Sequence, residues 1–226
     1  MTPSMGAASI ITFFMRLSYH ECRLTSTPCE NIIFTVISLK FISIEKKESG
    51  KFLHRYDLHY TDQNGLNRTY EMVSRRPEIK DFDELRNHRA DAVVMIMTDK
   101  DNEHMVLIHE YRMELGQTIY GLPGGLIDGD ETPEQCAKRE LKEETGLDLI
   151  EMREVLPPAA CTVGIGDERT VCVFGVADGE FHPDKSTGEE IEARWYSREE
   201  ILGLHKTDLF GSGALAYSWM WANGKL

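Results

Sequence analysis

Three glutamates crowd one face of a predicted helix in the middle of the chain. Glu140 and Glu144 are four residues apart, and Glu143 is three residues beyond Glu140, so their carboxylates lie side by side on a helix. Such like charges repel each other by roughly 0.2–0.5 kcal/mol per pair on an exposed helix. A divalent cation would turn this repulsion into coordination, because Mg²⁺ combines one or two carboxylates with water and substrate phosphates. These three residues, the glutamate cluster, therefore suggest phosphate chemistry, with a solvated acidic face as the alternative.

The helix that must position this cluster carries clear signals at both ends. Thr132 can cap it, Pro133 suits its first position, and Gln135 completes a capping box with Thr132. Gly146 tolerates the left-handed backbone that often follows a helix. We therefore predict a helix over Pro133–Thr145. Just before it, the glycines of the 122–126 segment predict a turn that can bring a backbone carbonyl close to the same ion.

The full spacing around this helix is more specific than the cluster alone. Nine positions carry it: Gly125, Glu131, Arg139, Glu140, Leu141, Glu143, Glu144, Gly146 and Leu147. The pattern resembles the Nudix box, the signature of hydrolases that cleave nucleoside diphosphates linked to another moiety, and no position departs from it. The resemblance covers roughly residues 40 to 225. It implies an α+β fold, the Nudix α/β/α sandwich, in which a small antiparallel N-terminal sheet precedes a mixed sheet that packs on the box helix.

The resemblance also implies a metal site and a mechanism. The Gly124 carbonyl, Glu140 and Glu144 would hold Mg²⁺, or Mn²⁺, with Glu143 assisting. A loop glutamate would deprotonate the water that attacks one phosphorus. Arg139 belongs to the catalytic set as the residue that orients the neighbouring glutamates.

The glutamate that acts as base falls in the 186–192 segment. Family members use a glutamate of the loop before the final core strand, and the usual position corresponds to Thr187 here. We favour Glu189 as the catalytic base, with Glu190 or Glu143 as alternatives.

Three further segments look like the ADP-ribose pyrophosphatase branch of this family, namely residues 70–76, 110–112 and 122–128. In that branch arginines bind the diphosphate or the flanking sugar, which implies substrate contacts for Arg112 and for Arg75 or Arg76. Guanidinium groups match phosphate oxygens bidentately. The alternative is that these are surface arginines paired with nearby acids.

The 161–169 segment departs from the branch, because it keeps the glycines and Glu168 but lacks a proline. We include Glu168 among the substrate-binding residues. ADP-ribose, another ADP-sugar, GDP-mannose and other nucleotide sugars all remain open as substrates. A non-catalytic sensor of ADP-ribose-like ligands is the alternative from another class, and the complete box favours the enzyme.

Composition limits the possible partners. The 226 residues carry a formal net charge of −13, whereas a protein that neutralises a nucleic-acid backbone needs a basic stripe. The same balance disfavours RNA decapping. No apolar run approaches the roughly 18–20 residues of a membrane span. We expect a small-molecule nucleotide-sugar substrate, no nucleic-acid partner and no membrane partner, and the resemblance adds a homodimer.

The five cysteines are odd in number and scattered, which fits a reducing compartment and hence the cytoplasm. A zinc site at His20, Cys22 and Cys29 is disfavoured because no second cysteine or histidine pair accompanies them.

The remaining pattern divides the chain into an uncertain extension (1–37), an N-terminal antiparallel sheet region (38–90) and a Nudix core (91–226). Alternation predicts strands over 52–61 and 66–75, and strands are also expected over 92–98, 104–111, 153–156, 170–176 and 192–196. The 62–65 segment predicts a hairpin turn, and residues 81–89 a short helix or loop. Helices are predicted over 198–204 and 213–223, the latter with Leu215, Trp219 and Met220 facing inward.

Overall fold

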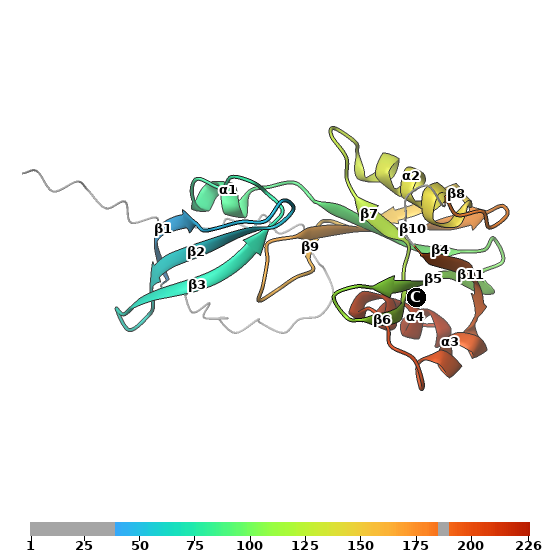
Figure 1. Ribbon diagram of the computed structural model, residues 1–226. Coiled ribbons are helices and arrows are strands. Elements are labelled where there is room, and N and C mark those ends of the chain that lie inside the picture. The colour runs from blue at the N-terminus through green and yellow to red at the C-terminus, as the bar shows by residue number, and fades with distance from the viewer. Residues whose placement is uncertain (1–38, 185–189) are drawn as a thin grey trace, which may run out of the picture. The chain divides into compact units, whose positions relative to one another are not determined.

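The structure is a computed structural model that describes residues 39–184 and 190–226, and all of these belong to one compact unit. Two sheets and four helices make up the described residues (Figure 1). Among them, no helix combines the length and the apolar character needed to cross a membrane.

The smaller sheet is antiparallel, as expected. It contains β1 (Lys40–Lys46), β2 (His54–Thr61) and β3 (Asn67–Ser74) in that order. The predicted turn joins β2 to β3, because Asp62 Oδ1 accepts from the backbone N–H groups of Asn64 and Leu66 (2.9 and 3.0 Å). The short helix α1 (Phe82–Arg86) follows, as one of the two alternatives had it.

The larger sheet is mixed, with strand order β11-β5-β4-β10-β8. Its strands are β4 (Ala92–Thr98), β5 (His104–Arg112), β6 (Gln117–Gly121), β7 (Gly124–Leu126), β8 (Asp148–Val155), β9 (Ala159–Ala160), β10 (Arg169–Asp178) and β11 (Ile191–Ser197). β10 runs parallel to β4, whereas the other named pairs are antiparallel. The expected mixed sheet is therefore confirmed.

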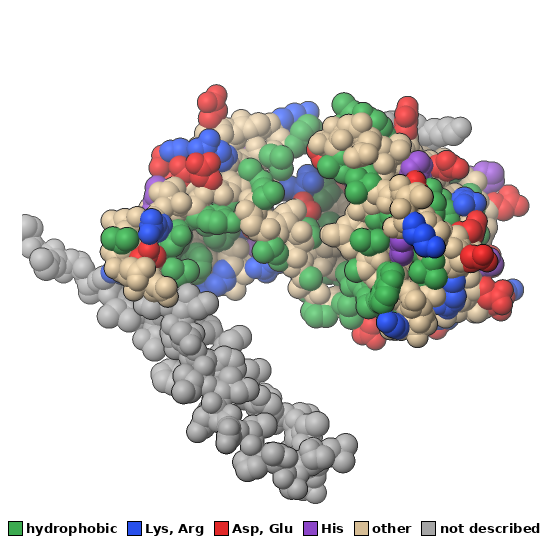
Figure 2. All heavy atoms as spheres, turned by 90° about the horizontal axis from the view of Figure 1, so that it is seen from below, with side chains coloured by type: hydrophobic (Ala, Val, Ile, Leu, Met, Phe, Trp, Pro, Cys, Tyr) green, Lys and Arg blue, Asp and Glu red, His purple; other side chains and the backbone are tan. Residues whose placement is uncertain are grey.

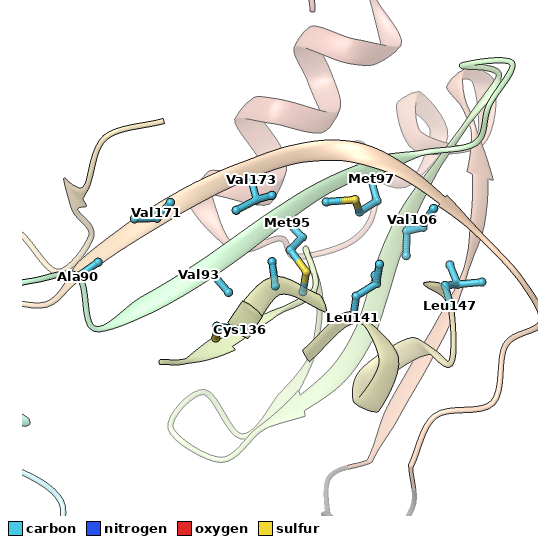
Figure 3. Packing of buried hydrophobic residues seen from close by; sticks show 12 residues of the cluster. Ala90, Val93, Met95, Met97, Val106, Cys136, Leu141, Leu147, Val171 and Val173 are labelled. Atoms are coloured by element: carbon cyan, nitrogen blue, oxygen red, sulfur yellow. The ribbon is translucent and has the colours of Figure 1, made fainter. Parts of the chain in front are cut away.

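Helices cover both faces of this sheet. Helix α2 (Pro133–Thr145) lies on one face, and α3 (Arg198–Leu204) and α4 (Ser212–Ala222) lie on the other (Figure 1). On the α2 face, Cys136 and Leu141 pack in one cluster with Met95 and Val173 of β4 and β10 (Figure 3). The predicted helix, its capping box and the left-handed residue at Gly146 (φ 82°) are all present. The sandwich implied by the Nudix resemblance is confirmed.

The inward face predicted for α4 is wrong. Leu215 and Trp219 are each 43% exposed, whereas Trp221 is 2% exposed. The Trp221 indole Nε1 donates to Asn102 Oδ1 (2.7 Å), and the Arg198 guanidinium lies 4.1 Å from its ring centroid. These tertiary contacts select the buried face, because α4 is apolar on all sides and its sequence does not single out a face.

Strand boundaries were less predictable than helix boundaries. β8 begins at Asp148, five residues before the predicted start, and β1, β6, β7 and β9 were not predicted. Gly124 and Gly125 were expected in a turn but pair with Val94 and Val93 of β4. Glycine has low strand propensity, so this pairing depends on distant residues rather than on the local sequence.

Candidate active site

The site begins where β7 passes under the C-terminal half of α2. The Gly124 backbone N–H donates to Glu144 Oε2 (2.8 Å), and Glu144 is only 9% exposed. A Cβ atom on Gly125 would lie 2.1 Å from the carboxyl carbon of Glu140. A Cβ atom on Gly124 would lie 2.4 Å from the Val93 carbonyl oxygen of β4, so the two glycines leave room for different neighbours, the β4 backbone at Gly124 and the Glu140 carboxylate at Gly125.

Arg139 connects the glutamates of this face. Its Nε and Nη2 donate to the two carboxylate oxygens of Glu131 (2.8 and 2.9 Å), which is a bidentate pair. Its Nη1 donates to Glu140 Oε1 (2.8 Å) and to Glu143 Oε2 (3.1 Å). The predicted role of Arg139 as the residue that orients its neighbours agrees with this geometry.

These contacts have electrostatic consequences. Hydrogen bonds from Arg139 lower the pKa of Glu131 to about 2 and, reciprocally, the Glu131 carboxylate raises the pKa of Arg139. Next to them, burial raises the pKa of the Cys136 thiol to about 12, so this cysteine is not a nucleophile at neutral pH. Glu131 and Arg139 are thus a permanent ion pair at the start of the site.

The glutamate cluster fits a hard divalent ion by the chemistry of its donors. All of its side-chain donors are carboxylate oxygens, which suit Mg²⁺ or Mn²⁺. Within the ranges 39–184 and 190–226, however, no three acidic, histidine or cysteine side chains converge as a metal-binding group. Glu140 and Glu143 turn toward Arg139 instead. Each of these contacts uses one carboxylate oxygen, and because a carboxylate has two oxygens, such a contact is compatible with holding an ion.

Arg112 of β5 is held by a residue that the sequence reasoning did not select. Its Nη2 lies 2.7 Å from Glu110 Oε1, and Glu110 is 9% exposed. A Cβ on Gly121 would lie 3.3 Å from that same oxygen. Alternation along the strand was the available signal for Glu110, because residues two apart share a face.

The other predicted substrate residues also form arginine–carboxylate pairs. Arg75 Nε donates to Glu168 Oε2 (2.7 Å), and Arg76 Nη2 donates to Asp167 Oδ2. All three predicted arginines therefore contact carboxylates, as the alternative interpretation anticipated. Contact with an acid does not remove an arginine from a binding site, since one guanidinium carries five donors.

The favoured base Glu189 lies outside the described residues, as do Thr187 and the disfavoured zinc residues at 20, 22 and 29. The described residues on either side of this part of the chain have defined neighbours. The Asp184 backbone N–H donates to the Glu143 carbonyl oxygen (2.7 Å), and Ile191 pairs with Glu110. Exposed Glu190 lies directly before Ile191, the residue of β11 that pairs with Glu110.

Comparison with known proteins identifies the relatives of this chain. Residues 88–216 match the model of the NUDIX domain. An ADP-sugar pyrophosphatase of Mus musculus is 28% identical over 174 residues, which cover 74% of this chain and 73% of that protein. A methanol dehydrogenase activator of Bacillus methanolicus is 36% identical over 77 residues, which cover 34% of this chain and 40% of the relative.

A solved structure shows the same fold. The crystal structure of an ADP compounds hydrolase superposes with a TM-score of 0.63 and 19% identity, covering 83% of this chain and 97% of that one. The superposition includes most of the chain, and at this identity it shows the fold alone.

Proposed function

Because this chain belongs to the NUDIX domain family, we propose that this Nudix hydrolase cleaves the diphosphate bond of a nucleoside diphosphate sugar. The first choice is ADP-ribose or a related ADP-sugar, and the products are a nucleoside monophosphate and a sugar phosphate. The observation that carries this proposal is the glutamate cluster, placed against the Gly124–Leu126 strand and connected through Arg139. GDP-mannose and other nucleotide sugars are the alternative substrates.

We assign each residue a role from its position. Glu140, Glu144 and the Gly124 carbonyl would hold Mg²⁺ or Mn²⁺, with Glu143 assisting, and the ion when bound would stabilise charge on the phosphoryl oxygens. Arg139 orients Glu140 and Glu143 through the contacts of its Nη1.

A glutamate of the segment before β11 accepts the proton of the attacking water. We propose Glu189 for this role, with Glu190 and Glu143 as alternatives. The support comes from described residues on either side, because Asp184 contacts the Glu143 backbone and Ile191 pairs with Glu110.

The ADP-sugar assignment rests on two kinds of support. The alignment with the mouse ADP-sugar pyrophosphatase extends over 74% of this chain, well beyond the box. In addition, Arg112 and Arg75 carry exposed guanidinium groups (47% and 43% of their side chains) that suit a diphosphate. Glu168, bonded to Arg75, would face the flanking sugar.

The test is a panel of nucleotide sugars, NADH and dinucleoside polyphosphates, each incubated with Mg²⁺ and resolved by chromatography. We expect AMP and ribose phosphate from ADP-ribose, and slower release of GMP and mannose phosphate from GDP-mannose. Binding of ADP-ribose without turnover of any compound would favour the sensor instead.

We also propose that the protein works as a homodimer in the cytoplasm. The resemblance to the ADP-ribose pyrophosphatase branch supports the dimer, and the odd number of cysteines supports the reducing compartment. Light scattering during gel filtration should give twice the chain mass of 25.8 kDa. A particle of one chain mass at micromolar concentration would contradict the dimer.

A further inference from the structure

The 161–168 loop of the larger sheet runs along β3 of the smaller sheet. The Val73 backbone N–H donates to the Ile165 carbonyl oxygen (2.9 Å), and Val73 forms a parallel bridge with Gly166. The Tyr70 hydroxyl donates to the Gly164 carbonyl oxygen (2.8 Å). The loop therefore contacts β3 through an isolated parallel bridge at Val73 and a side-chain hydrogen bond from Tyr70.

Two arginine–carboxylate pairs lie next to this contact, Arg76 with Asp167 and Arg75 with Glu168. The first pair is largely buried. The side chains of Arg76 and Asp167 are 22% and 13% exposed. Arg76 also donates to the carbonyl oxygens of Glu84 (2.8 Å) and Leu85 (3.4 Å). The Ser74 hydroxyl donates to Asp167 Oδ2 (3.2 Å). Both terminal nitrogens of Arg76 are thus engaged within the protein, which leaves little donor capacity for a substrate.

The pair of Arg75 with Glu168 is more exposed to solvent. The side chains of Arg75 and Glu168 are 43% and 24% exposed, and they share one hydrogen bond, through Arg75 Nε. In the described part of the chain, neither terminal nitrogen of Arg75 donates a hydrogen bond. These two nitrogens form the edge of a guanidinium that binds a phosphate bidentately.

We propose that the two neighbouring arginines have different roles. Arg75 contacts the diphosphate of the substrate, whereas Arg76 and Asp167 form a positioning pair that fixes β3 to the loop and so holds Arg75 and Glu168 in place. This inference rests on the proposed function for its substrate. It separates two arginines that the sequence treats as equivalent candidates.

A double-mutant cycle tests the division, using Arg75→Gln, Arg76→Gln and the variant with both changes. Steady-state kinetics with ADP-ribose give KM and kcat, and amide hydrogen exchange at Val73 reports the attachment of the loop. We expect Arg75→Gln to raise KM by about tenfold or more, the effect of a lost charge-assisted hydrogen bond. Its kcat should stay within a few-fold of wild type, and its Val73 exchange should be unchanged.

Arg76→Gln should raise KM by a similar factor and also accelerate exchange at Val73. Because the positioning pair acts through Arg75, the doubly changed protein should show no higher KM than Arg75→Gln alone. A partly unfolded protein would instead lose kcat at constant KM, since only the active fraction falls. Asp167→Asn removes the same pair from the loop side and replaces Arg76→Gln if that variant does not fold.

Two results would overturn the division of roles. KM effects that multiply in the doubly changed protein would show that both arginines contact substrate independently. A raised KM in Arg76→Gln without faster amide exchange at Val73 would show that Arg76 contacts the substrate itself. If no nucleotide sugar is hydrolysed, the proposed function fails, and the exchange data alone decide whether Arg76 attaches the loop.

Discussion

Arg139 determines how the charges of the glutamate cluster are arranged, because one guanidinium contacts Glu131, Glu140 and Glu143. The bidentate pair with Glu131 uses one edge of the planar group, so the Nη1 nitrogen points at the other two carboxylates. This division of donors requires the fixed geometry of arginine.

Arg139→Lys tests that requirement. The change keeps the positive charge but cannot reproduce the bidentate pair and the two further contacts together. We expect kcat/KM for ADP-ribose to fall by about 10- to 100-fold, as for other residues that orient catalytic groups, while circular dichroism stays unchanged. Arg153→Lys, on an exposed position of β8, is the matched control. An Arg139→Lys enzyme with wild-type kinetics would show that the contacts of Arg139 do not matter for catalysis.

The ion pair of Glu131 with Arg139 predicts that the stability of the fold depends on pH. The pKa of Glu131 is lowered from 4.5 to about 2 in the folded protein, so the folded state binds fewer protons than the unfolded state between these values. The lowered pKa of Glu131 therefore adds to the free energy of unfolding, fully above about pH 4.5 and progressively less as the pH falls toward 2. Urea unfolding of wild type and Arg139→Gln between pH 2 and 5 should show a steeper loss in wild type. If the free energy of unfolding fell equally with pH in both proteins, the pKa of Glu131 would not depend on Arg139.

At the scale of elements, the approach of α2 to β7 decides the geometry of the site. The Glu140 carboxylate lies so close to the β7 backbone that a Cβ at position 125 would overlap it, and the carboxylate would have to move. The pairing of β7 with β4 holds that backbone in place.

Gly125→Ala should therefore displace the Glu140 carboxylate. We expect hydrolysis of ADP-ribose to drop by at least about a hundredfold, comparable to the loss of one electrostatic contact in an active site. Gly203→Ala in α3 is the control, because nothing lies within 4 Å of its added methyl group. That change should leave activity intact and stabilise the fold by about 0.5–1 kcal/mol. Equal activity of both variants would argue against the steric requirement at Gly125.

How well the sequence predicted each element depends on where its signals lie. The helix α2 begins and ends as predicted, since Thr132, Pro133, Gln135 and Gly146 act locally. The strand β7 could not be foreseen, because its two glycines pair with residues some thirty positions earlier in the chain. The buried face of α4 depends equally on distant contacts, those of Trp221 with Asn102 and Arg198.

The same distinction holds for the site. The sequence selected the glutamate cluster and Arg139 because their spacing on one helix is informative by itself. It could not separate Arg75 from Arg76, since neighbouring residues differ only in what the fold places around them. Glu110 was not selected, because alternation places it on the same face as Arg112 but does not show that it is buried.

At the scale of the whole molecule, the candidate residues come from distant parts of the chain. They lie on helix α2, strand β5, the 161–168 loop and the residues just after β3, and their convergence on one substrate is part of the proposed function. The face in Figure 2 shows acidic and basic side chains interspersed over its described part, without a continuous basic stripe.

The most direct test of the proposed function is Mg²⁺-dependent release of AMP from ADP-ribose by wild type and Glu144→Gln. The substitution removes a carboxylate charge but keeps an oxygen that can accept from the Gly124 N–H, so the fold should survive. Glu199→Gln, at an exposed position of α3, is the control. We predict AMP release by wild type and Glu199→Gln, abolished by EDTA, and a loss of at least about a hundredfold in Glu144→Gln. Undiminished release by Glu144→Gln would contradict the account.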